Sequence, residues 1–171
     1  MDKLLIILLG VCSYFLIKKV TSSKPENFLL RNNIIVAVGD SHVEPGSALI
    51  SELQKLMPDF TISALGIRGY TTTRWLNSQA EFKNRISGAG IVLLSIGDND
   101  VAAGKTTQQI NANIENLKAL LDYDQVFVYI NPPRTLSGIN LANDGIHLTR
   151  SGAQQYAPRI KEKIVHEISN R

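Results

Sequence analysis

The amino-acid sequence predicts an α/β domain built on a parallel sheet with helices on both faces. Short apolar runs alternate along the chain with longer segments whose apolar residues recur at helical spacing. The runs are nearly continuous in apolar residues, as expected of strands that are buried on both faces. The chain has 171 residues, which fits one domain. Strands that alternate with helices in this way are typical of a parallel sheet.

Four apolar runs predict the strands, in the order in which they occur. They are residues 34–38, 60–65, 90–97 and 125–131. The third run contains no polar side chain except Ser95, and the fourth is stopped by Pro132 and Pro133. Since only four strands are clear, we expect a short sheet of four to five strands.

The segments that follow these runs predict the helices. They are residues 45–57, 71–86, 106–123 and 150–170. Pro45 suits a first helical turn, and the threonines that open the second segment are available as caps. Pro158 lies inside the last segment, so we expect a kink or a division of that helix.

The beginning of the chain is a separate apolar segment. Leu4–Ile17 carries no charge and precedes Lys18 and Lys19. As a helix this run spans about 21 Å, against roughly 30 Å of bilayer hydrocarbon, and the lysines could reach the interface. We expect a membrane signal-anchor with the domain facing the cell envelope; a cleaved signal peptide with secretion, and a helix buried in the domain, stay open as alternatives. The expected parts are an anchor at residues 1–20, a linker at 21–32 and a domain at 33–171.

Composition narrows the classes of function. The net charge is only +3, and lysine and arginine are scattered without a basic stripe, which argues against nucleic-acid binding. Cys12 is the single cysteine, so an intrachain disulfide and a cysteine-rich metal cluster are excluded. We expect a monomer.

Polar residues gather where the predicted strands end. Residues 39–41, Gly-Asp-Ser, follow the first strand, Gly66 follows the second, and residues 97–100, Gly-Asp-Asn-Asp, follow the third. In open parallel sheets ligands bind at the carboxyl ends of the strands. We therefore expect the functional site at this edge.

The residue types fit acyl transfer, which needs a nucleophile, a base, a group that orients the base and donors for an oxyanion. Ser41 is the candidate nucleophile. Asp144 and His147 are the candidate orienting acid and base because His147 follows Asp144 by three positions in a loop. His42 adjoins Ser41 and is expected to point elsewhere, as a bystander. His166 lies in the terminal helix.

The expected oxyanion donors come from three strand ends. They are the backbone N–H of Ser41, the backbone N–H of Gly66 and the side-chain amide of Asn99. We expect Asp40 and Asp100 to be structural residues. Tyr70, Trp75 and Arg68 are open between pocket lining and ordinary packing or exposure.

Four short motifs resemble the blocks of the SGNH (GDSL-type) hydrolase family. They are "GDS" at 39–41, "ALGIRG" at 64–69, "GDND" at 97–100 and "DGIH" at 144–147. The resemblance implies a flavodoxin-like three-layer α/β/α fold and esterase, lipase or carbohydrate deacylase activity without a metal. It also implies a Ser41–His147–Asp144 triad and an oxyanion hole of Ser41, Gly66 and Asn99. The segment between Pro133 and Asp144 is short for this family, which favours a shallow pocket and small acyl groups such as acetyl.

We therefore expect a serine esterase without a cofactor that removes small acyl groups, through an acyl-enzyme, from esters such as O-acylated cell-envelope carbohydrate. Three alternatives stay open. An O-acetyltransferase would use the same triad. Asp40, Asp98 and Asp100 could instead hold Mg²⁺ in a phosphoryl-transfer or receiver-like domain. A non-catalytic protein could bind the envelope without turnover.

Overall fold

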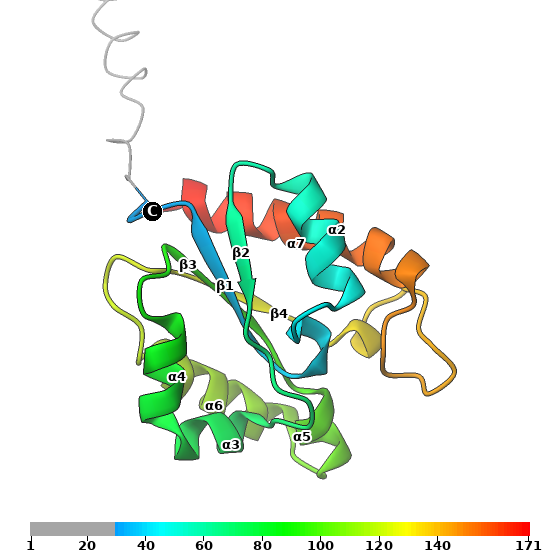
Figure 1. The fold of residues 1–171 in the computed structure, drawn as a ribbon. Coiled ribbons are helices and arrows are strands. Elements are labelled where there is room, and N and C mark those ends of the chain that lie inside the picture. Colours follow the sequence, from blue (N-terminus) through cyan, green and yellow to red (C-terminus); the bar gives the residue numbers. More distant parts are fainter. Residues whose placement is uncertain (1–29) are drawn as a thin grey trace, which may run out of the picture.

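The structure is a computed structural model that describes residues 30–171 (Figure 1). The predicted anchor at residues 1–20 and residues 21–29 of the predicted linker lie outside the described residues. Within residues 30–171, no helix combines the length and the apolar character that crossing a membrane requires.

Four parallel strands form one sheet, as the sequence predicts. In spatial order they are β2 (Thr61–Ala64), β1 (Ile34–Gly39), β3 (Ile91–Ser95) and β4 (Val126–Ile130). Gly39 pairs with Ser95, and Ser95 with Ile130, so three strands end at one level. This alignment brings the loops that follow β1, β3 and β4 to the same edge of the sheet.

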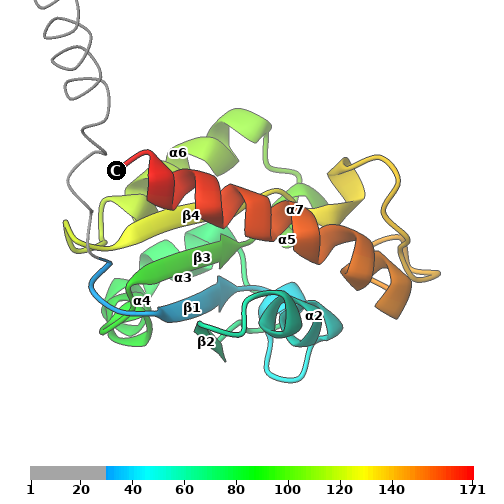
Figure 2. The ribbon, with the colours of Figure 1, turned by 90° about the horizontal axis from the view of Figure 1, so that it is seen from above.

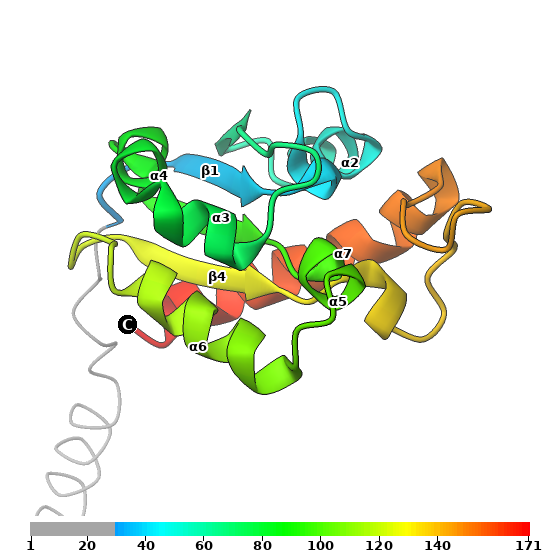
Figure 3. The same cartoon turned by 90° about the horizontal axis from the view of Figure 1, so that it is seen from below.

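Helices cover both faces and complete the expected three layers (Figures 1 and 2). One face carries α2 (Ala48–Leu56) and α7 (Arg150–Ser169), and the other carries α3 (Thr72–Asn77), α4 (Gln79–Ile86) and α6 (Thr107–Lys118), as Figure 3 shows from below. Successive residues of β1 alternate between the two faces, because side chains alternate along a strand. Each layer of helices therefore encloses its own apolar core.

Two predicted helices differ at their boundaries. The first begins at Ala48 rather than near Pro45, because the Ser47 side chain caps it by accepting a hydrogen bond from the Ile50 N–H. The second predicted helix is divided at Ser78 into α3 and α4. Asparagine and serine at this junction compete with the helical backbone for hydrogen bonds, which favours an interruption there.

The sequence predicts a kink or a division of the last helix at Pro158. The helix is not divided, because α7 runs unbroken from Arg150 to Ser169. Pro158 lies on its exposed side, and buried residues such as Tyr156 and Ile160 hold the opposite face to the sheet. The sequence analysis did not predict three short elements, all at the carboxyl edge of the sheet. They are the 3₁₀ turns η1 (Ser41–Val43) and η2 (Pro133–Thr135) and the helix α5 (Asp98–Ala102).

Candidate active site

Ser41 lies at the first position of η1, directly beyond β1. Gly39 is required before it, since a Cβ at Gly39 would lie 1.7 Å from the carbonyl oxygen of Ser95. The Gly39 carbonyl accepts hydrogen bonds from the Trp75 side chain (3.2 Å) and from the Ile67 N–H (3.1 Å). The turn that presents Ser41 is therefore held from two sides.

Ser41, His147 and Asp144 form a hydrogen-bonded chain, as their sequence pattern suggests. The distance from Ser41 Oγ to His147 Nε2 is 3.1 Å, and that from His147 Nδ1 to Asp144 Oδ2 is 2.6 Å. The hydrogen bond from His147 and the backbone N–H groups of Ile146 and His147 hold the pKa of Asp144 well below its usual range. An ionised carboxylate can only accept, so Nδ1 carries the proton and Nε2 is free to accept from Ser41 Oγ.

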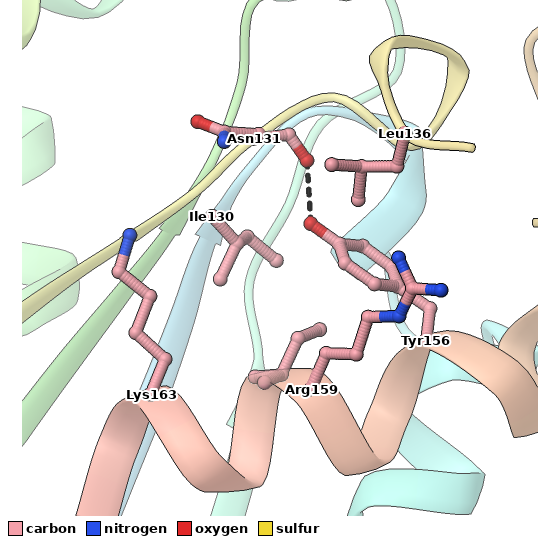
Figure 4. A pocket seen from close by; sticks show the side chains of 7 residues that line it. Ile130, Asn131, Leu136, Tyr156, Arg159 and Lys163 are labelled. Carbon is pink, nitrogen blue, oxygen red and sulfur yellow. Dashed lines mark hydrogen bonds between the residues drawn. The ribbon is translucent and has the colours of Figure 1, made fainter. Parts of the chain in front are cut away.

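Contacts between its own residues hold the loop that carries Asp144 and His147. Leu141 and Leu148 form an antiparallel bridge, and Ala142 N–H donates to the His147 carbonyl at 2.7 Å. At the start of the segment that leads from β4 to this loop, the Asn131 carbonyl accepts a hydrogen bond from the Tyr156 hydroxyl of α7 (Figure 4). These contacts fix the path of the chain from β4 to the histidine.

Tyr156 also lines a cavity of about 150 Å³ beside the end of β4, shown in Figure 4. Arg159 and Lys163 border it, while Ile130 and Leu136 contribute apolar surface. None of the predicted site residues lines this cavity.

Asn99 lies on α5, and its amide Nδ2 donates to the Tyr70 carbonyl at 3.0 Å. The second Nδ2 hydrogen has no acceptor among the described residues. Gly66 differs from the expectation that its N–H faces the pocket. Its N–H donates to the Val43 carbonyl at 3.0 Å, and the residue is buried. A Cβ here would lie 2.2 Å from the Asp40 carbonyl oxygen, so Gly66 lets two loops approach closely.

In the described part of the chain, Gly69 has a free backbone N–H, whereas the Gly66 N–H is already bonded to Val43. The sequence analysis did not select Gly69. It occupies the third position of a turn closed by the hydrogen bond from Tyr70 N–H to the Ile67 carbonyl, with φ of 76°. Within residues 30–171 the N–H groups of Gly69 and Ser41 have no protein acceptor. The Asn99 amide donates to the carbonyl of Tyr70, the residue that follows Gly69, so this turn lies beside the amide. The signal in the sequence was the second glycine of "ALGIRG".

The His42 ring binds away from Ser41, as expected, and it has a partner that the sequence analysis did not predict. It is buried, and its Nε2 lies 2.8 Å from Asp98 Oδ2. Arg134 of η2 also contacts the Asp98 carboxylate. The rings of His42 and His147 are 5.9 Å apart.

Protein groups bind each of the three strand-end aspartates, Asp98 through His42 and Arg134. Asp40 accepts from the His42 N–H, and burial raises the pKa of Asp40 to about 6. Asp100 accepts from the backbone and hydroxyl of Thr72 and pairs with Lys105. Residues 30–171 contain no group of three or more histidine, cysteine or acidic side chains placed to hold a metal. The structure thus adds no support for the magnesium alternative.

A cavity of about 160 Å³ opens at Ser41 and His147. Glu44 and Ser47 give its wall polar groups, and Leu148 gives an apolar one. Of the open candidates, Trp75 is buried in the core, Arg68 pairs with Glu44 at 2.7 Å, and Tyr70 packs edge-on against Trp75. The space beside the serine is thus small and partly polar.

Solved structures of known proteins share the fold of this chain. No family model and no curated protein matches this sequence. A family 3 carbohydrate esterase of Clostridium thermocellum aligns with a TM-score of 0.61 at 16% identity, over 80% of this chain and 97% of its own. A lipolytic protein of the G-D-S-L family from Desulfitobacterium hafniense gives 0.58 at 14%, over 75% and 99%. The esterase EstA from Pseudoalteromonas gives 0.54 at 16%, over 81% and 98%.

The fold and the strand-end loops define a doubly wound α/β protein of flavodoxin-like topology. More specifically, residues 30–171 have the SGNH (GDSL-type) hydrolase fold.

Proposed function

We propose that this protein is a serine esterase that removes small acyl groups from esters. The observation that carries the proposal is the chain of hydrogen bonds from Ser41 through His147 to Asp144. A serine hydroxyl at a strand end, an imidazole within hydrogen-bond reach and an ionised carboxylate behind it supply the nucleophile, the base and the orienting group of acyl transfer.

In the proposed reaction, Ser41 Oγ attacks the ester carbonyl carbon while His147 Nε2 takes the hydroxyl proton. Asp144 holds the proton on Nδ1 and stabilises the imidazolium that forms. The C–O bond to the alcohol then breaks, and His147 returns the proton to the leaving oxygen. Water, deprotonated by His147, attacks the resulting acyl-Ser41 ester, and His147 returns the proton to Ser41 Oγ as the acid leaves.

The proposed oxyanion hole consists of the N–H of Ser41, the amide of Asn99 and the N–H of Gly69. Gly69 replaces Gly66 because the Gly66 N–H already donates to Val43. Donors that lack a protein acceptor are available to the charge that develops on the carbonyl oxygen. Each such donor typically contributes about 10²–10³ in kcat.

The substrate class follows from the size of the site and from its structural neighbours. A cavity of about 160 Å³ suits acetyl-sized groups better than long acyl chains. Two neighbours are described as family 3 carbohydrate esterases and another as an acetyl-xylooligosaccharide esterase. We therefore propose an O-acylated carbohydrate of the cell envelope, reached by a monomeric domain that Leu4–Ile17 tethers to the membrane.

The direct test is turnover of p-nitrophenyl acetate and p-nitrophenyl butyrate by the full chain, with and without a chelator. We expect hydrolysis of both, faster for acetate, and no effect of the chelator. Hydrolysis that the chelator abolishes would favour the magnesium alternative. Absence of any hydrolysis, together with a failure of Ser41 to react with a fluorophosphonate, would reject the esterase.

A further inference from the structure

A buried group of side chains joins three neighbouring strand ends beneath the candidate site. His42 follows β1, Asp98 follows β3 and Arg134 follows β4, in the order in which these strands lie in the sheet. His42 Nε2 lies 2.8 Å from one oxygen of Asp98, and Arg134 Nε contacts the other. Arg134 also donates to the Asp98 backbone carbonyl at 2.6 Å. The three loops are thus tied together through one carboxylate.

The burial of these residues distinguishes them from surface pairs. The side chains of His42 and Asp98 are 2% and 3% exposed, and that of Arg134 is 24% exposed. Replacing a buried polar pair with apolar groups of similar volume is often neutral for stability. Apolar residues could therefore fill this space without loss of stability. A role in positioning explains the presence of three polar side chains here better than a contribution to folding does.

Two members of the group adjoin a residue of the proposed site in the sequence. His42 is next to Ser41 in η1, and Asp98 is next to Asn99 in α5. Arg134 lies on the segment that continues to Asp144 and His147. A movement of Asp98 relative to His42 would therefore change the spacing between the nucleophile and the oxyanion donor.

The other charged groups near His42 do not replace this link. Asp40 accepts from the His42 backbone N–H and does not bind its ring. Asp100 is held by Thr72 and Lys105 on the far side of α5. His147 faces His42 at 5.9 Å between ring centres, without a hydrogen bond between them. Among the described residues, Asp98 is the single partner of the His42 ring nitrogens.

We propose that His42 is a positioning residue, which acts through Asp98 and Arg134 to hold Ser41 and Asn99 at the spacing that the transition state requires. This inference rests on the proposed esterase function. A misplacement of about 1 Å in such a site can lower the rate by about 10²-fold, while ground-state binding changes little.

The test compares two variants of the full chain. His42→Phe keeps a ring but cannot bond to Asp98, whereas His42→Gln keeps an N–H that can reach the carboxylate. For p-nitrophenyl acetate we expect His42→Phe to lower kcat by about 10–100-fold with KM within about two-fold, and His42→Gln to recover most of the loss. His166→Phe, at the exposed end of α7, is the matched control and should equal the wild type.

Arg134→Met provides a second test if His42→Phe fails to fold, because Arg134 reaches the surface. It should also lower kcat with KM unchanged, and combining it with His42→Phe should add little, because the residues act as one unit. A folded His42→Phe with wild-type kcat, or a His42→Gln as slow as His42→Phe, would overturn the positioning role alone. For Arg134→Met, wild-type kcat would do the same. A wild-type protein that neither hydrolyses esters nor reacts with a fluorophosphonate would overturn both proposals.

Discussion

Two carboxyl groups of the site stand in opposite electrostatic surroundings. Asp144 is half exposed and accepts three hydrogen bonds, of which the one from His147 contributes most to lowering its pKa. Asp40 is buried beneath the nucleophile, and loss of solvation raises its pKa to about 6. Asp144 therefore stays charged beside the base, and Asp40 becomes neutral in weak acid.

The first prediction concerns the hydrogen-bonded chain at Ser41. Ser41→Ala and His147→Ala should each remove most of the esterase activity, and the double variant should be little slower than either one. The reason is that a nucleophile and its base act as a unit, so the second removal finds little left to lose. Steady-state kcat on p-nitrophenyl acetate measures this. Strictly additive losses would mean that the two residues do not share one step.

The second prediction concerns Asp40 and pH. Its folded-state pKa of about 6 exceeds the ordinary 3.8, so the native protein keeps a proton that the unfolded chain loses over this interval. The free energy of unfolding should therefore fall as pH rises from about 4 to about 6, by about 3 kcal/mol from this group alone. Asp40→Asn cannot titrate and should show a smaller fall. Urea unfolding at about pH 4.5 and about pH 7 makes the comparison; equal falls would place the pKa of Asp40 near its ordinary value.

At the scale of single residues, the sequence predicted which residues lie at the candidate site better than it predicted their hydrogen-bond partners. Asp144 and His147 could be paired from their spacing, because one turn of chain brings the two together. Gly66 and Gly69 could not be told apart, since the choice depends on which N–H the Val43 carbonyl takes. For the same reason the partner of the His42 ring was not predicted: Asp98 lies 56 residues away.

At the scale of elements, close contacts between loops set the shape of the site more than helix propensity does. β1, β3 and β4 were predictable because they are nearly continuous in apolar residues, whereas β2 alternates polar and apolar residues. The short helix α5 was not, because its sequence is polar and its Asp100 is held by Thr72 of another helix. Tertiary contacts of this kind override local preference.

The third prediction uses one such contact between loops. A Cβ at Gly66 would meet backbone atoms of Asp40 and Val43 at 2.2 and 2.7 Å, so Gly66→Ala must displace the turn that carries Ser41. We expect a loss of about 1–3 kcal/mol in the free energy of unfolding together with reduced kcat in the folded protein. Urea unfolding and kcat on p-nitrophenyl acetate measure the two effects.

Gly88→Ala is the control for the Gly66 variant. Its φ is +79° with open space around the Cβ position, so the substitution strains the backbone without touching the Ser41 turn. It should lose stability, by about 1–2 kcal/mol, at unchanged kcat. If Gly66→Ala also kept its kcat, the close approach of the two loops would matter for folding only.

At the scale of the whole molecule, the alternation of strands and helices predicts a parallel sheet but not the order of its strands. The order β2-β1-β3-β4 brings β1 to the middle and its loop next to that of β3. The sequence predicted that these loops share an edge, but the network through Asp98 depends on strand neighbours that no local pattern specifies.

The described part begins at Leu30, which packs against the core, and Arg31 pairs with Asp122. The folded domain thus includes the end of the predicted linker.

The last prediction separates the domain from the apolar segment before it. A chain that starts at Lys24 keeps Leu30 and Arg31 with their contacts, so it should fold, stay soluble and match the kcat of the full chain on p-nitrophenyl acetate. The full chain should sediment with membranes and need detergent for release, since each large side chain of Leu4–Ile17 gains about 1.5–3 kcal/mol on leaving water. Carbonate washing of membranes and thermal unfolding of the shorter chain measure the two halves of this claim. If the shorter chain is insoluble or loses its cooperative transition, Leu4–Ile17 packs on the domain itself, and the membrane tether and the envelope substrate inferred from it both fail.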